Sequence, residues 1–336
     1  MGMDIVLTSA AFLIAAACVG VMGFAIQRGA TCTVAAVDEV VSKRGFKRLA
    51  AFIEASVWVA GGLLVAHVLH LLPKMPAGYA LTGWTLAGGA LLGLGAFINR
   101  ACVFGAIARF GSGEWAYLAT PIGFYVGCLS AGPIFAAGTH ARLPHGSPVL
   151  QAPAWVAVMF LLFVLWRLAR PLWDKGSDGA NASLMARARA AVTARIWSPH
   201  AATTIIGITF LIVLLLLGGT WAYTDVLAEL ARGMAGNLTG RVVLVLALLA
   251  GAVWGGWTAG RFRSARVTPA QVLRCFIGGI LMAWGGLLIP GSNDGLILVG
   301  MPLLWPYAWV AFGVMCLAIA AASVVTKALA PRLANG

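Results

Sequence analysis

Two cysteines lie where apolar stretches give way to short polar runs, a position from which a thiol can contact an anion. Cys102 follows Asn99 and Arg100 at a break in an apolar stretch, where a short helix is expected to begin. Cys32 lies in a glycine-containing polar run just after the first apolar stretch. Backbone N–H groups at a helix N-terminus attract anions and favour a thiolate. The alternative for each cysteine is a small, buried apolar residue without a chemical role.

A polar run in the second half of the chain, Ser292-Asn293-Asp294-Gly295, interrupts another apolar stretch. A carboxylate such as Asp294 is costly inside a membrane and usually functional there. Ser, Asn and Asp also cap the first turn of a helix, so this run supports a cap, a place on a substrate pathway, or both. Because a carboxylate repels an anion, Ser292 and Asn293 are better candidates than Asp294 for contacting one.

The two polar runs occupy matching positions in a repeated motif. Residues 88–107 and 278–297 align without a gap, and the alignment places Gly105 on Gly295. Duplicated halves whose hydrophobic segments are interrupted at matching positions are typical of transporters with a substrate site at the breaks.

The composition requires a membrane around these motifs. Of the 336 residues, 61% are hydrophobic and only 10% are charged, and the mean hydropathy is +0.93. Apolar runs of about 20 residues are typical of membrane helices. We therefore expect an all-α polytopic membrane protein with about nine transmembrane helices. The expected spans are residues 5–26, 49–72, 82–98, 117–138, 153–170, 201–219, 240–258, 272–289 and 305–326.

The order of the spans predicts inverted repeats, because a single span separates two sets of four. In this 4+1+4 arrangement residues 1–145 and 201–336 are the repeats, and residues 146–200 hold the fifth span and a cytoplasmic segment. Nearly all Lys and Arg residues then fall on one side, which predicts an external N-terminus and a cytoplasmic C-terminus. The expected location is the bacterial cytoplasmic (inner) membrane. Basic loops also explain the net charge of +13, so nucleic acid is not expected as a partner.

Four segments fit neither spans nor ordinary loops: 27–45, 99–115, 220–238 and 290–304. Each follows an apolar span and carries glycine with small or polar residues, which indicates a short half-helix that re-enters the membrane. Irregular backbone at that depth is tolerated where it is buried in protein or lines a cavity. We expect the four half-helices to meet near the midplane and form an hourglass with a narrow waist. Residues 182–196 are expected to form an amphipathic helix on the membrane surface.

The sequence contains no motif for a disulfide framework, a metal site, a nucleotide site or a hydrolase site. The six cysteines include no CxxC pair, so neither a disulfide framework nor a zinc site is expected. No nucleotide-binding loop, metal motif or hydrolase elbow is present, and no cofactor and no catalytic residue are expected.

Together, three motifs resemble the YeeE/YedE sulfur-transport family. They are RGATCT at residues 28–33, NRACVFG at 99–105 and PGSNDG at 290–295, and the resemblance covers nearly the whole chain. It implies an hourglass of inverted repeats that imports thiosulfate along cysteines through weak S–H···S contacts. It also admits a cytoplasmic sulfur-carrier protein as a partner, although the chain shows no docking motif.

The resemblance assigns roles to three positions. Cys102 matches the central cysteine of the family and Cys32 matches the cysteine of its first motif. A further family cysteine corresponds to Ser292 here, which puts a relay of three thiols in doubt; a serine hydroxyl can still donate a hydrogen bond to an anion.

The resulting hypothesis is a permease for thiosulfate or a related small sulfur anion. The expected pathway residues are Cys102, Cys32, Ser292, Asn293, Asp294, Gly105, Gly295 and Arg100. Arg28, Arg100 and Arg109 are expected to attract the anion at a cytoplasmic vestibule or to anchor the membrane surface. Two alternatives stay open: a membrane-embedded thiol relay enzyme that delivers sulfane sulfur as a persulfide to a cytoplasmic acceptor, and a non-transporting scaffold.

Overall fold

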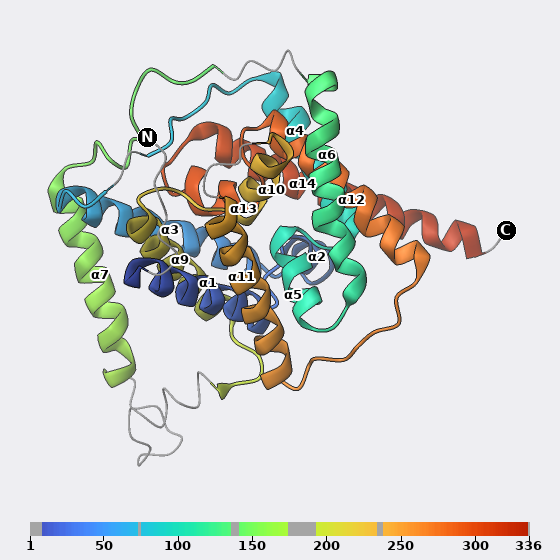
Figure 1. The fold of residues 1–336 in the computed structure, drawn as a ribbon, viewed down its shortest axis with the longest axis horizontal. Coiled ribbons are helices and arrows are strands. Elements are labelled where there is room, and N and C mark those ends of the chain that lie inside the picture. The colour runs from blue at the N-terminus through green and yellow to red at the C-terminus, as the bar shows by residue number, and fades with distance from the viewer. Residues whose placement is uncertain (1–8, 73–74, 136–140, 174–192, 234–237, 335–336) are drawn as a thin grey trace.

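The computed structural model describes residues 9–72, 75–135, 141–173, 193–233 and 238–334, which form helices joined by loops (Figure 1). Within these residues there is no sheet, only an isolated β-bridge between Tyr79 and Arg142. The elements are α1 (Ala10–Arg28), α2 (Thr33–Lys43), α3 (Lys47–Val68), α4 (Gly83–Asn99), α5 (Val103–Gly111), η1 (Trp115–Leu118), α6 (Ala119–Phe135), α7 (Ala154–Trp173), α9 (Pro199–Leu217), α10 (Tyr223–Ala231), α11 (Leu238–Thr258), α12 (Pro269–Leu288), α13 (Asn293–Gly295), the π-helical turn η2 (Leu296–Gly300) and α14 (Pro306–Ala334). The expected all-α fold is confirmed.

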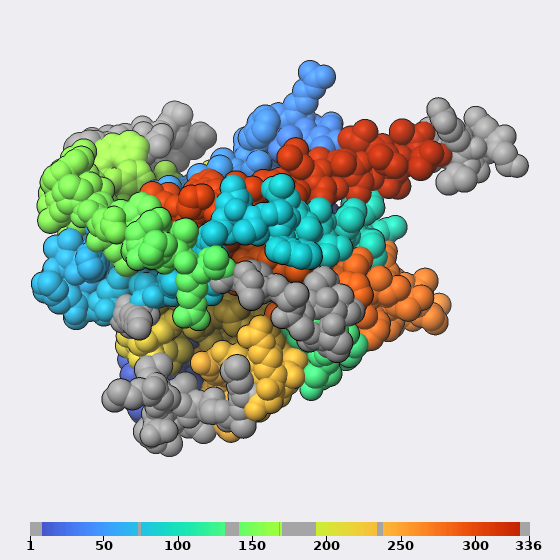
Figure 2. All heavy atoms as spheres, turned by 90° about the horizontal axis from the view of Figure 1, so that it is seen from above, coloured from blue at the N-terminus to red at the C-terminus, as the bar shows by residue number. Residues whose placement is uncertain are grey.

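Seven helical stretches are long and apolar enough to cross a membrane, so the chain is a multi-pass membrane protein. They are α1 with α2, α3, α4 with α5, α9, α11, α12 and α14. The other two predicted spans also coincide with helices, but α6 has 17 residues and the apolar part of α7 is Ala154–Arg167. At its C-terminal end α14 extends away from the body of the molecule (Figures 1 and 2). The surface helix expected over residues 182–196 falls largely outside the described residues.

Several of the long helices begin with a side-chain cap. Thr268 and Gln271 form a capping box at the start of α12, and Ser198 caps α9, whose first residue is a proline. These caps satisfy N–H groups that the helix itself cannot bond. The four short helices α2, α5, α10 and α13 have no such side-chain cap.

The helices of the first half recur in the second half after 190 residues. The residue before α2, Cys32, corresponds to Ala222 before α10, and Cys102 before α5 corresponds to Ser292 before α13. Helix contacts recur as well: α1 packs on α11 as α3 packs on α9, and α12 packs on α6 as α4 packs on α14. The repeat seen in the sequence is therefore also a repeat of helices and of the contacts between them.

Glycines bring the two halves together where α4 crosses α12. A Cβ on Gly88 would lie 2.8 Å from the Gly285 carbonyl oxygen, and a Cβ on Gly95 would lie 2.8 Å from that of Gly278. The contact therefore runs antiparallel, since an early residue of α4 meets a late residue of α12 and the reverse. It is also reciprocal, because Gly88 corresponds to Gly278 and Gly95 to Gly285, as a two-fold axis between the halves requires. Small residues permit this close approach of two helix backbones.

Replacing Gly95 with valine should disrupt the crossing between the halves. The new Cβ would meet backbone atoms of Gly278 and Met282, both at 2.8 Å, which cannot move without shifting α12. Overpacking of this kind typically costs about 1–3 kcal/mol, so we expect a lower yield of monodisperse protein and a lower melting temperature in detergent. Gly313→Val is the control, because a Cβ on Gly313 meets nothing within 4 Å. Equal stability of the two variants would contradict the close approach.

Candidate functional site

The N-termini of the four short helices gather at the centre of the helix bundle. Helix α2 contacts α5, α5 contacts α13, and α13 contacts α10. The residues that precede these helices are Cys32, Cys102, Ser292 and Ala222. Helix N-termini carry unpaired N–H groups and partial positive charge, so their convergence suits an anion.

Cys102 and Cys32 form a buried pair of thiols. Cys102 is fully buried and Cys32 is 9% exposed, and their sulfur atoms are 3.9 Å apart, within range of a weak S–H···S hydrogen bond. The Thr33 backbone N–H also donates to the Cys102 sulfur, at 3.1 Å. Both cysteines are free thiols, and the structure brings together the two that the sequence singled out.

Ser292 and Asn293 form a polar pair beside the thiols. The hydroxyl of Thr33 donates to Asn293 Oδ1 at 3.3 Å, so Thr33 links the two pairs. The exposed fraction of Ser292 is 4% and that of Asn293 is zero. Ser292 Oγ and Asn293 Nδ2 have no hydrogen-bond partner among the described residues. Buried polar groups are nearly always bonded, so these two groups are available to a ligand.

Asp294 bonds to a different helix from its own. It is buried and accepts hydrogen bonds from Thr224, from the backbone N–H at 3.2 Å and from the hydroxyl at 2.5 Å. Thr224 is the second residue of α10, so Asp294 satisfies the first turn of that helix. Of the two roles that the sequence left open, these contacts favour a cap, although the helix that is capped is α10.

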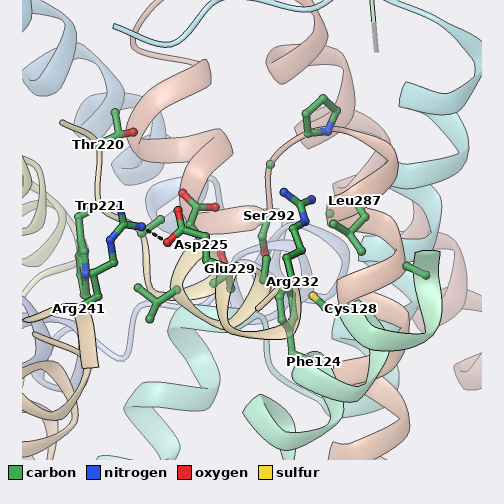
Figure 3. Close-up of a pocket in the computed structure, with 18 of the residues that line it drawn as sticks. Phe124, Cys128, Thr220, Trp221, Asp225, Glu229, Arg232, Arg241, Leu287 and Ser292 are labelled. Carbon is green, nitrogen blue, oxygen red and sulfur yellow. Dashed lines mark hydrogen bonds and ion pairs between the residues drawn. The ribbon is translucent and has the colours of Figure 1, made fainter. Parts of the chain in front are cut away.

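A cavity lies on each side of this centre. One cavity, the Cys32 cavity, has a volume of about 950 Å³ and is lined by Cys32, Gly105 and Arg100 among others. The other, the Ser292 cavity, has a volume of about 500 Å³ and is lined by Ser292 and Ala222 among others (Figure 3). Cys102 and Asn293 are not among the residues that line either cavity, but Cys102 contacts Cys32 of the first cavity and Asn293 follows Ser292 of the second.

The two cavities are counterparts in the repeat but differ in charge. Ala30, Cys32 and Phe97 line one, and the residues 190 positions later, Thr220, Ala222 and Leu287, line the other. The cations of the Cys32 cavity are Arg48, Arg100, Arg109, Arg261, Arg274 and Lys327. Its anions are Asp38 and Glu114, which pair with Lys327 and Arg109. The Ser292 cavity has Arg232, Arg241, Asp225 and Glu229. The Cys32 cavity is therefore strongly basic, whereas the Ser292 cavity has as many acidic as basic groups.

Arg28 does not belong to either cavity. It is 3% exposed, and its guanidinium donates to the carbonyl oxygens of Gly255 and Ala194 and to the Thr258 hydroxyl. It also lies over the Phe24 ring. The prediction that Arg28 attracts the anion at a vestibule is therefore wrong, because groups of α11 and of the segment before α9 hold its guanidinium. The alternative role as an anchor at the membrane surface stays a prediction. Arg100 and Arg109 do line the Cys32 cavity.

Gly105 and Gly295 are equivalent in the repeat but not in their surroundings. A Cβ on Gly105 would lie 2.5 Å from the Cys32 sulfur, whereas a Cβ on Gly295 would meet nothing within 4 Å. Gly105 therefore makes room for the thiol pair, and the packing around Gly295 demands no such space.

Three polar residues near the centre were not among the site residues predicted from the sequence. Thr33, Thr224 and Asp225 occupy the first turns of α2 and α10. Their position just after a break in an apolar stretch was the available signal, since first-turn residues of a half-helix face the same centre as the residue before the helix.

Comparison with known proteins agrees with these features. A family model described as sulphur transport matches residues 28–321, which is most of the chain. The thiosulfate transporter TsuA of Escherichia coli (strain K12) is 24% identical over 327 residues, which cover 91% of this chain and 92% of TsuA. The chain therefore belongs to the sulphur transport family, also called YeeE/YedE.

Proposed function

We propose that this protein imports thiosulfate, or a closely related small sulfur anion, through the constriction between the two cavities. The observation that carries the proposal is the buried centre where the Cys32–Cys102 pair meets the unbonded groups of Ser292 and Asn293. In a scaffold that served only for packing, buried polar groups such as these would be expected to form hydrogen bonds within the protein. The substrate of TsuA, a relative over nearly the whole chain, points to the same class of anion.

The chemistry of the centre suits thiosulfate, which has a soft terminal sulfur and three hard oxygens. Thiols contact the sulfur through weak S–H···S bonds, while hydroxyl, amide and helix N–H donors replace water around the oxygens. Several weak contacts in series let an anion leave as well as bind. Gly105 and Gly295 belong to the proposed pathway, and Asp294 supports it by holding α10 on α13.

We further propose that the chain crosses the membrane nine times as inverted repeats, with residues 146–200 linking 1–145 to 201–336. The antiparallel α4–α12 crossing supports a two-fold axis in the membrane plane, and the two cavities support an hourglass. The positive-inside rule puts the basic Cys32 cavity at the cytoplasm and the Ser292 cavity outside, in the bacterial cytoplasmic membrane. Arg100 then draws the anion toward the cytoplasm, where a sulfur-carrier protein could receive the product.

Uptake of radiolabelled thiosulfate by purified protein in liposomes tests the function, with sulfate and selenium analogues as competitors. We expect saturable uptake into protein-containing liposomes and none into empty ones. Mass spectrometry after exposure to thiosulfate tests the alternative relay enzyme: we expect Cys102 to be unmodified, and a persulfide on Cys102 would favour the enzyme. Absence of uptake with every anion would contradict a permease.

Ser292→Cys tests the position at which this chain departs from the family pattern. A thiol is a weaker donor than a hydroxyl and a softer partner, so it should favour the sulfur end of the anion over its oxygens. We expect thiosulfate uptake to persist and competition by sulfate to weaken by about threefold, by analogy with the modest effect of one altered contact. Cys275→Ser, a change at a fully buried cysteine of α12 that lines neither cavity, is the control. Unchanged rate and competition in Ser292→Cys would make Ser292 a bystander.

A further inference from the structure

The Ser292 cavity contains a carboxylate without a hydrogen-bond or ion-pair partner among the described residues. Three carboxylates, Asp294, Glu229 and Asp225, cluster around α10. Asp294 accepts two hydrogen bonds from Thr224. Glu229 forms an ion pair with Arg241, drawn as a dashed line in Figure 3. Asp225 has neither a hydrogen bond nor an ion pair among the described residues, and it lines the cavity itself.

Asp225 lines the same cavity as two buried donors. It is the third residue of α10, which begins at Tyr223, and Figure 3 shows it between Trp221 and Ser292. Trp221 is 6% exposed and Ser292 is 4% exposed, and Trp221 Nε1 and Ser292 Oγ have no partner among the described residues. Two unbonded donors on the wall of one cavity point to an anionic or polar ligand there, in the cavity that Asp225 also lines.

An ionised Asp225 conflicts with that ligand. A carboxylate repels a divalent anion strongly at short range in a partly enclosed site. It also offsets the positive end of α10, which would otherwise attract the anion. The corresponding residue of the other half is Ala35 in α2, so the Cys32 cavity has no such group at this place.

The neighbouring cations do not form an ion pair with Asp225 among the described residues, so its charge would still repel the anion. Arg241 is already paired with Glu229, and Arg232 lines the same cavity without an ion pair among the described residues. The titratable or charged groups that face Asp225 or share its cavity are Tyr223, Glu229 and Arg232 of α10, Arg241 of α11, Asp294 of α13, Tyr307 of α14, Cys128 of α6, and Tyr79. Protonation of Asp225 removes the repulsion while leaving Arg232 free to attract the anion.

We propose that Asp225 binds a proton together with the anion, so that the two bind cooperatively in the Ser292 cavity. This inference rests on the proposed function and adds a coupling ion to it. The proton comes from the solution outside and converts the carboxylate to a neutral carboxyl group. By linkage, an anion that favours the protonated form of Asp225 binds more tightly when protons are abundant.

The pH dependence of thiosulfate uptake tests the proposal. In proteoliposomes with a fixed internal pH, we expect the apparent KM for external thiosulfate to rise as the external pH is raised from about 6 to about 8, by up to about tenfold per pH unit for one linked proton. Thiosulfate itself stays deprotonated throughout this range. Asp225→Asn should transport with a KM independent of external pH, and Asp225→Glu should restore the dependence.

Asp38→Asn provides the matched control, since Asp38 is an aspartate on the Cys32 cavity that pairs with Lys327. This variant should keep the pH dependence of the unmodified protein. A KM that is independent of pH in the unmodified protein, or a dependence that persists in Asp225→Asn, would overturn the role of Asp225. Absence of thiosulfate uptake at every pH would instead overturn the proposed function, and this inference with it.

A binding measurement keeps the proposal testable if Asp225→Asn transports poorly. Thiosulfate is mixed with detergent-purified protein in a weakly buffered solution that contains a pH indicator. The unmodified protein should take up protons and make the solution more alkaline, and Asp225→Asn should not. Binding of thiosulfate to the unmodified protein without proton uptake would overturn the proposal.

Discussion

Replacing Cys102 with alanine should lower thiosulfate uptake by about a hundredfold or more, because a buried binding group that is removed leaves its partners unsatisfied. Cys102 is fully buried, and on the proposed pathway the anion passes it between the two cavities. The change also removes the acceptor of the Thr33 N–H and the partner of the Cys32 sulfur. Uptake of radiolabelled thiosulfate into liposomes measures the loss.

The variant should still fold, which separates a loss of transport from a loss of protein. Deleting one buried sulfur atom leaves a small cavity and costs about 1 kcal/mol or slightly more. Cys275→Ala is the matched control: Cys275 is also fully buried, but it lies in α12 and lines neither cavity. Both variants should elute as single species in detergent, and only Cys102→Ala should lose uptake. Normal uptake by Cys102→Ala would remove Cys102 from the mechanism.

Gly105→Ala should also reduce uptake strongly, by about tenfold or more if one weak contact to the anion is lost. The new methyl group would lie 2.5 Å from the Cys32 sulfur and 3.0 Å from its Cβ, so the thiol must leave its present position beside Cys102. Because a thiol at the end of a side chain can rotate, we expect the protein to fold with a displaced Cys32. Initial uptake rates at equal protein content measure the effect.

The repeat supplies the control for this prediction. Gly295 is the equivalent residue of the second half, and a methyl group there meets nothing within 4 Å. Gly295→Ala should therefore transport at nearly the normal rate, although it carries the same substitution at the same place in the repeat. Equal loss in both variants would mean that helix flexibility, and not room for the thiol pair, is what these glycines provide.

The sequence was sufficient to predict the helices and the places where short helices begin. Long apolar stretches and their polar interruptions are strong signals that depend only on neighbouring residues. Cys102 and Ser292 therefore fell at the starts of α5 and α13 as expected. The repeat added a constraint between distant segments, since two copies of one motif must fold alike.

Contacts between helices could not be predicted in the same way. Arg28 resembles a vestibule cation in sequence, yet carbonyl groups from two distant segments surround it. Asp294 looks like a cap for its own helix, yet its partner is Thr224 of α10. Gly105 and Gly295 are the same residue type at equivalent positions of the repeat. Their surroundings differ because the Cys32 side chain lies next to Gly105 only. In each case the deciding neighbour is set by how the helices pack.

The glycine crossing of α4 with α12 has a consequence for synthesis on the ribosome. The first half leaves the translocon before α12 exists, so the glycine face of α4 then has no partner helix and the Thr33 hydroxyl has no Asn293 to accept its hydrogen bond. Polar groups without partners are costly in lipid, so the first half alone is less stable than the complete chain. Stalling translation between α6 and α9 should therefore yield a nascent chain that membrane quality-control proteases degrade quickly.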